Sequence, residues 1–197
     1  MRKPALCLIS LVLVLSVSAC SRSPRSNFYT LVPQALPPGQ ALSAAAPSVS
    51  VGPVTIPEVV DRPQIVVRVA ENRVEVLESH RWAEPLKSEI PRLMAQELGR
   101  MLGSSRVSSY GQSAGADATY RVLVDIARLE AVPGEAAVVQ ALWTVRRGSA
   151  RIKGESLVRE KVSGPGYDQL VSACSRALAG VSSDIAKAIQ VDAAALP

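Results

Sequence analysis

Few side chains in this sequence could act as a base, a nucleophile or a metal ligand. His80 is the single histidine, and the three cysteines, Cys7, Cys20 and Cys174, lie far apart in the chain. The sequence contains no glycine-rich phosphate loop and no H-E-x-x-H, G-x-S-x-G or C-x-x-C motif. We therefore expect no enzyme, no cofactor and no metal site, because a general base, a nucleophile and a ligand cluster are all missing.

Cys20 is the residue whose neighbours indicate a specific reaction. A positive start, Met1-Arg2-Lys3, precedes an apolar run over 5–17 that is shorter than the roughly 20 residues a membrane span needs. Val17-Ser18-Ala19-Cys20 then resembles the bacterial lipobox, in which the cysteine thiol is lipidated, the chain is cleaved before it and the new amino group is acylated. We predict a signal peptide over 1–19 and a lipid on Cys20. The alternative is an ordinary signal peptide followed by a chance cysteine.

The residues after Cys20 indicate where the lipid would hold the protein. Ser21 resembles the residue found in lipoproteins that move on to the outer membrane, which predicts a body on the periplasmic face of that membrane. Residues 20–27 are expected to form a lipidated tether. Three acyl chains would make such an anchor effectively permanent, whereas a single chain binds only marginally.

Cys174 has no cysteine left to pair with once Cys7 is removed and Cys20 is lipidated. It belongs to a set of apolar residues at helical spacing, which predicts a place in the core. The other members are Leu170, Leu178, Val181 and Ile185. A reactive thiol is the alternative interpretation.

Composition excludes several classes of protein. The chain has 197 residues, of which 48% are hydrophobic and 20% charged, as expected of one globular domain. The formal net charge of +5 falls to +3 when Arg2 and Lys3 leave with the signal peptide. Such a small and scattered surplus makes nucleic acid an unexpected partner.

Residues 28–197 are expected to form the folded domain, with a proline- and alanine-rich linker over 33–48. Gly52-Pro53 predicts a bulge or an edge position in a strand, and Pro91 predicts a kink in a helix. The turns at Pro133-Gly134 and Gly148-Ser149 predict that the strands around them form an antiparallel meander. Periodicity predicts strands over 28–32, 49–51, 54–56, 65–69, 74–76, 120–129, 137–146 and 152–162, and helices over 85–102 and 167–189. The fold class is therefore α/β, with a mixed, largely antiparallel sheet covered by helices.

Several polar and aromatic residues have two possible roles. His80 is expected in a solvent-facing loop, and Glu84, Glu89 and Glu97 on an ordinary solvated helix face. Trp82 either packs beside Leu86 as a hydrophobic staple or contacts a partner. Trp143 alternates with apolar residues and is expected in the core.

Four segments together resemble one known family. They are the lipobox at Cys20 and residues 28–31, 51–66 and 81–86. In order and spacing they are similar to the ABC-type transport auxiliary lipoproteins of the PqiC type. The resemblance implies a three-layer α/β sandwich like the N-terminal domain of TolB, and it supplies no catalytic residues.

The resemblance also implies a function and partners. The protein would work with a mammalian-cell-entry (MCE) protein and an ABC permease and ATPase in lipid transport across the periplasm, supporting envelope integrity. Pro57, Asp61, Arg62 and Pro63, in a loop that two prolines stiffen, and Trp82 are candidates for partner docking. A rigid connection is the other interpretation of this loop. An activator or scaffold for cell-wall enzymes, a lipid-binding carrier and a homo-oligomer remain open.

Overall fold

The computed structural model describes residues 25–35, 41–111 and 115–195. The predicted signal peptide, Cys20 and most of the tether lie outside the described residues, as do residues 36–40 of the predicted linker. Residues 41–48 of that linker are hydrogen-bonded to the domain; for example, the backbone N–H of Ser43 donates to the carbonyl of Gly103 at 2.7 Å.

The main sheet contains five strands. They are β5 (Val107–Ser109), β2 (Val49–Thr55), β6 (Tyr120–Val132), β7 (Ala136–Arg147) and β8 (Ala150–Lys161), in this spatial order. β2 runs parallel to β5 and β6, and β6, β7 and β8 form the expected antiparallel meander. The meander was predictable because alternation marks its strands and glycines with positive φ, Gly134 and Gly148, form its turns.

β2 is irregular in its middle, as Gly52-Pro53 predicted. Its pairing with β6 shifts between Val51 and Val54, and the Gly52–Pro53 peptide bond is cis. Gly52 has a φ of 122°, and a Cβ atom there would lie 2.7 Å from Cβ of Tyr110, so a glycine is required for two reasons.

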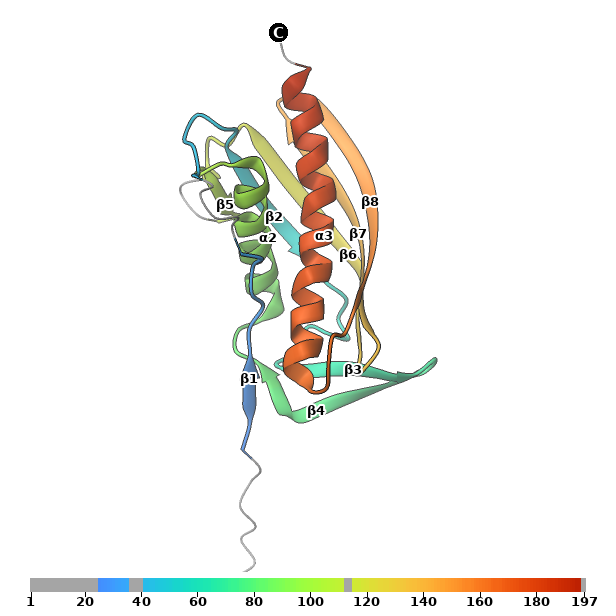
Figure 1. Cartoon of the computed structure of the whole chain (residues 1–197). Coiled ribbons are helices and arrows are strands. Elements are labelled where there is room, and N and C mark those ends of the chain that lie inside the picture. Colours follow the sequence, from blue (N-terminus) through green and yellow to red (C-terminus); the bar gives the residue numbers. More distant parts are fainter. Residues whose placement is uncertain (1–24, 36–40, 112–114, 196–197) are drawn as a thin grey trace, which may run out of the picture.

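A second sheet of three strands lies at one end of the main sheet (Figure 1). β3 (Gln64–Ala70) and β4 (Arg73–Trp82) form the expected hairpin, and β1 (Asn27–Tyr29) pairs parallel with the last residues of β4. The chain therefore enters the domain at the end where the hairpin lies.

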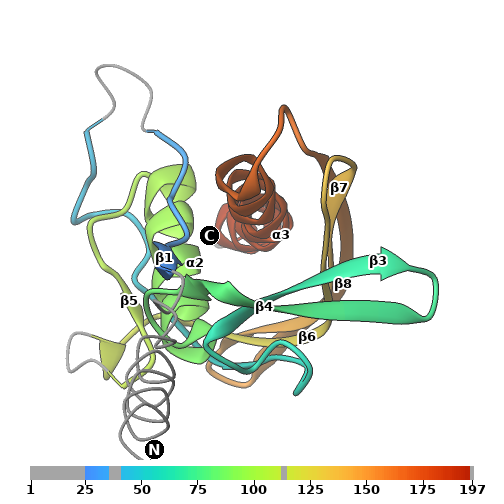
Figure 2. The same cartoon turned by 90° about the horizontal axis from the view of Figure 1, so that it is seen from below.

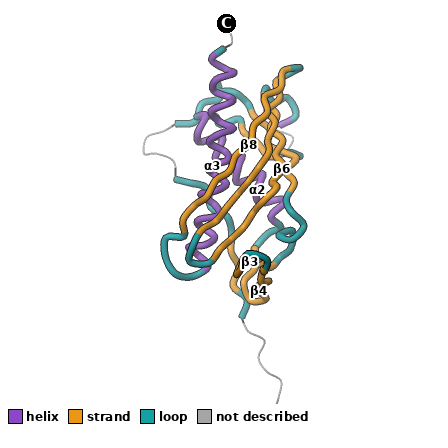
Figure 3. Tube along the Cα trace, turned by 90° about the vertical axis from the view of Figure 1, so that its right-hand side faces the viewer, coloured by secondary structure: helices purple, strands orange, loops and turns teal. Residues whose placement is uncertain are grey.

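Two helices cover one face of the main sheet, and none of the described helices lies on the other face (Figure 3). α2 (Leu86–Leu102) and α3 (Tyr167–Ala194) lie side by side in the concave side of the sheet (Figure 2). α2 ends at Gly103, which has a φ of 62°, and its helical turns continue through Pro91. No helix among the described residues is long and apolar enough to cross a membrane.

The core lies between the helices and the sheets. Trp143 is buried there, as expected, beside fully buried residues of α2 and α3 such as Ile90, Leu98 and Ile185. The mixed α/β class predicted from the sequence is confirmed, with the strands divided between two sheets.

Cys174 is a core residue, which confirms the packing interpretation. Its side chain is buried in α3, and burial raises the pKa of the thiol to about 12. The thiolate that would be the reactive species is therefore scarce at neutral pH.

We expect Cys174→Ala to lower the free energy of unfolding by about 1 kcal/mol, because it deletes one buried sulfur atom. Urea denaturation measures this loss, and the partner binding of the variant should equal that of the wild-type chain. A stable variant that has lost its function would show that the thiol has a role beyond packing.

Candidate functional site

The N-terminal chain joins the domain along a path where buried polar side chains of α2 and α3 bind its backbone. β1 pairs with His80, Arg81 and Trp82 of β4, and the chain then continues beside α2 and α3 as the N-terminal segment, residues 30–34 (Figure 1). In this segment Pro33 has no N–H, and the N–H groups of Leu31, Val32 and Gln34 all donate to side chains of the two helices.

Glu89 of α2 binds the first part of the N-terminal segment. Its Oε1 atom accepts the N–H of Leu31 at 2.8 Å and the hydroxyl of Thr30. The side chain is buried, with an exposed fraction of 1%. Its Oε2 atom is buried without a hydrogen-bond partner among the described residues. The expected solvated position of Glu89 was wrong.

Glu97, two turns further along α2, binds the other end of the segment. Its Oε1 atom accepts the N–H of Gln34 at 2.5 Å, and its Oε2 atom accepts Nε and Nη2 of Arg100 at 3.0 and 2.8 Å. Its exposed fraction is 0%, so its expected solvated position was also wrong. The carboxylate is stabilised because it is both paired and hydrogen-bonded.

Ser175 of α3 holds the middle of the segment. Its hydroxyl accepts the N–H of Val32 at 3.1 Å and donates to the carbonyl of Val171 at 3.1 Å. The side chains that bind the segment thus span eight residues of α2, about 12 Å, and include α3. They fix the course of the N-terminal segment along the two helices.

The rings of Tyr29, His80 and Tyr167 lie together where the chain enters the domain. His80 lies in β4 and is half-buried, so its predicted position in a solvent-facing loop was wrong. Its Nδ1 atom is 2.7 Å from the hydroxyl of Tyr29, and its ring centroid lies 4.1 Å from that of Tyr167. β4 extends through His80 because β1 supplies its second hydrogen-bonding partner there.

Trp82 ends β4 and is buried, with an exposed fraction of 8%. Its backbone N–H donates to the carbonyl of Pro63 at 2.7 Å, and its side chain belongs to the same core as Leu86. A buried indole offers little surface to a partner, and the backbone of Trp82 is bonded to Pro63 at the end of the loop over 57–64.

The docking loop predicted around Asp61 is exposed and ordered by its own backbone. The N–H groups of Val60 and Asp61 donate to the carbonyls of Pro57 and Glu58, at 3.1 and 3.2 Å. Pro63 and Arg62 are exposed, whereas Pro57 is half-buried. Asp61 pairs with Nζ of Lys87 at 2.5 Å, which ties the loop to α2.

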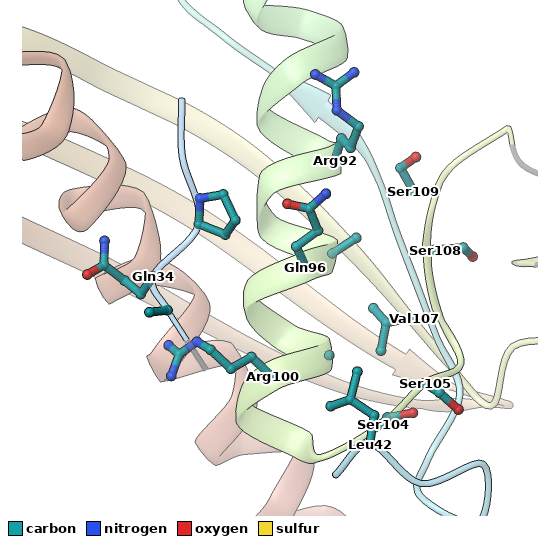
Figure 4. A pocket seen from close by; sticks show the side chains of 14 residues that line it. Gln34, Leu42, Arg92, Gln96, Arg100, Ser104, Ser105, Val107, Ser108 and Ser109 are labelled. Carbon is teal, nitrogen blue, oxygen red and sulfur yellow. The ribbon is translucent and has the colours of Figure 1, made fainter. Parts of the chain in front are cut away.

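A groove of about 630 Å³ lies beside the N-terminal segment, between α2 and β5 (Figure 4). Arg92 and Arg100 line the groove. The guanidinium of Arg92 is bound to the carboxylate of Glu84, and that of Arg100 to the carboxylate of Glu97. The groove also has neutral polar groups, which come from Gln96 and from the serines in β5 and just before it. Among the described residues no group of three or more histidine, cysteine, aspartate or glutamate side chains could hold a metal ion.

The sequence analysis did not identify Glu89, Glu97 and Ser175 as candidate site residues, although the spacing of Glu97 was one signal. Glu97 continues the spacing of Leu86, Ile90 and Leu93, the apolar stripe of α2. A carboxylate in such a stripe must be paired when it is buried. Its partner could not be foreseen, because it is the backbone of a segment about 60 residues away.

Comparisons with known proteins agree with this architecture. A crystal structure described only as an uncharacterized protein superposes with a TM-score of 0.68, at 20% identity over 84% of this chain and 99% of that chain. Protein XCC0632 from Xanthomonas campestris superposes with a TM-score of 0.60, at 16% identity over 82% and 93%. At these identities the likeness shows the fold alone.

A comparison with curated protein sequences finds no significant match. The family model that describes the ABC-type transport auxiliary lipoprotein component, however, matches residues 29–186. The match begins inside β1 and ends within α3, and so includes the N-terminal segment and the side chains that bind it. The chain therefore belongs to the family of ABC-type transport auxiliary lipoprotein components.

Proposed function

We propose that the protein is an outer-membrane lipoprotein of the periplasm and a non-catalytic subunit of an ABC system that moves lipid between membranes through an MCE-domain protein. The observation that carries this proposal is the family match over residues 29–186, which follows a sequence that resembles a lipobox and ends at Cys20. An auxiliary component needs a fixed position and a surface for docking, and neither requires a reactive centre.

The N-terminal segment supports an anchored body. β1 begins at Asn27, so only residues 21–26 lie between Cys20 and β1, and the hydrogen bonds to Glu89, Ser175 and Glu97 hold the chain directly after β1. At about 3.5 Å for each residue, this tether reaches some 20–25 Å. The hairpin of β3 and β4 would then lie near the membrane that holds the lipid.

Lipidation is tested by Cys20→Ala. We expect the variant to accumulate as an uncleaved precursor or as a body without acyl chains, because the acceptor thiol is gone. Mass spectrometry of the intact protein and membrane fractionation measure both outcomes, with Cys7→Ala as the matched control. A normally processed Cys20→Ala protein that stays in the outer-membrane fraction would refute the anchor.

The partner is tested by co-purification of the full lipidated chain. Recovery of the MCE-domain protein of the same transport system supports the proposal. Recovery of a peptidoglycan synthase in its place would favour an activator or scaffold for cell-wall enzymes. Native mass spectrometry of the same sample tests the carrier interpretation, which requires a bound phospholipid.

We propose further that the loop over 57–64 contributes to docking, since it is exposed and its conformation is restricted before binding. Arg62 has no ion-pair partner among the described residues, whereas Asp61 is paired with Lys87. The Arg62 charge is therefore available to meet a partner.

We expect Arg62→Glu to weaken association with the MCE-domain protein about ten-fold, or 1.4 kcal/mol, and to leave folding intact. Arg73→Glu is the control, because it reverses an exposed arginine outside the loop and should bind as the wild-type chain does. Equal affinities for the wild-type chain and Arg62→Glu, measured by biolayer interferometry, would eliminate this loop as a docking site.

A further inference from the structure

The face of the main sheet that the helices leave uncovered carries a row of arginines at one end. Arg121 of β6 is paired in register with Arg146 of β7, which is in turn paired with Arg151 of β8. All three residues are exposed, as is Lys153 in the next position on the same face of β8. We call these four residues the basic row.

The basic row has no ion-pair partner within the part of the chain that the structure describes. The ion pairs formed by the described residues neutralise arginines and lysines elsewhere on the domain, and none of them includes a residue of the row. Directly opposed residues in a sheet have Cβ atoms about 4.5–5.5 Å apart, and like charges at that spacing are destabilising. Such a cost to folding is characteristic of a surface kept for binding.

The position of the row indicates what it can reach. The row lies where β6 begins and β7 ends. At this end of the sheet, Nε of Arg147 pairs with Oδ2 of Asp192 in α3 at 2.6 Å. β1 enters at the opposite end of the domain (Figure 1). The row is therefore directed away from the membrane to which the tether leads.

The rest of the same face favours a protein as the occupant. Leu142 and Leu157 are exposed there, with exposed fractions of 51% and 66%. Asp125 and Glu155 flank Leu142 on the neighbouring strands. Exposed apolar side chains beside mixed charges are typical of protein interfaces, whereas two carboxylates on the face would oppose a continuous phosphate surface.

We propose that this face docks an acidic surface of a protein partner, with the basic row bound to its carboxylates and the two leucines covered. The arginines would mainly increase the association rate and set the orientation. The inference rests on the proposed function only for the identity of the partner, the MCE-domain protein. The binding chemistry follows from the sheet alone.

The test is the triple variant Arg121→Thr, Arg146→Thr, Arg151→Thr in the full lipidated chain. Threonine suits a strand and removes the opposed charges, so we expect the variant to be at least as stable as the wild-type chain. Arg73→Thr with Lys161→Thr is the matched control, because it removes two exposed cations elsewhere. The first probe is the purified MCE-domain protein, measured at 50 and 300 mM salt.

We expect the triple variant to bind this probe at least ten-fold more weakly at 50 mM salt and to lose most of the salt dependence, while the control is unchanged. Equal binding by the wild-type chain and the triple variant would overturn the docking face and leave the proposed function standing. No binding by the wild-type chain would count against the proposed function.

In that case a second probe, a polyglutamate peptide, decides the docking face independently. Binding that requires the three arginines supports it, and absence of binding overturns it. Two further results would also overturn it. One is retention on phosphatidylglycerol vesicles that depends on the row, which would indicate a membrane. The other is self-association in sedimentation that the triple variant abolishes, which would indicate a second copy.

Discussion

Replacing Glu89 and Glu97 together by alanine should release the N-terminal segment from the helices. The two carboxylates accept the N–H groups of Leu31 and Gln34, and Glu89 also accepts the hydroxyl of Thr30. A hydrogen bond to a charged acceptor contributes about 1.5–3 kcal/mol. We expect the amides of Leu31, Val32 and Gln34 to lose protection against hydrogen exchange by about two powers of ten, or roughly 3 kcal/mol.

Three matched variants separate this effect from a general loss of helix stability. Glu84→Ala removes an exposed carboxylate that is bonded to Arg92, and it should leave the protection of the segment unchanged. Glu89→Gln and Glu97→Gln keep an acceptor oxygen and should restore most of the protection. If the double alanine variant retained wild-type exchange at all three amides, the segment would be held by packing and not by these glutamates.

Gly154→Val should strongly destabilise the fold. A Cβ atom on Gly154 would lie 2.2 Å from Cζ2 of Trp143, far inside van der Waals contact. Moving the indole would break a chain of hydrogen bonds from Trp143 to Ser156 at 3.0 Å and from Ser156 to Asp184 at 2.9 Å. That chain joins β7, β8 and α3 across the core.

We expect Gly154→Val to lower the free energy of unfolding by about 3 kcal/mol or more. Strand propensity alone predicts the opposite sign, because valine favours strands and glycine does not. Urea denaturation distinguishes the two, with Gly154→Ala as a milder variant if the valine protein does not fold. Gly164→Ala is the control, since its Cβ would meet Gln169 at an ordinary 3.5 Å. A Gly154→Val protein as stable as this control would contradict the packing argument.

The sequence predicted those parts of the fold that depend on nearby residues. The meander of β6, β7 and β8 is encoded by alternation and by glycine turns, and the end of α2 by Gly103. β5 was missed because its three residues have little pattern, and it forms by pairing with β2, more than 50 residues earlier. The end of β4 was missed for the same reason, since β1 completes it.

The candidate site was predicted less well, because it depends on contacts between distant segments. Glu89 and Glu97 are charged residues in an amphipathic helix, where a solvated face is the usual position. Their burial follows from the N-terminal segment, whose backbone covers and pairs them. A local sequence pattern shows that a carboxylate is present, but it does not show which distant backbone N–H groups will donate to that carboxylate.

The course of the N-terminal segment has a mechanical consequence. A pull from a lipid on Cys20 would act lengthwise along β1, which lies parallel to the last residues of β4. Hydrogen bonds that lie across the direction of a force share it in shear and must yield together, whereas a strand peeled from one end yields bond by bond. The bonds to Glu89, Ser175 and Glu97 follow in series behind β1, so a domain pulled by its N-terminal end should resist extraction by tension.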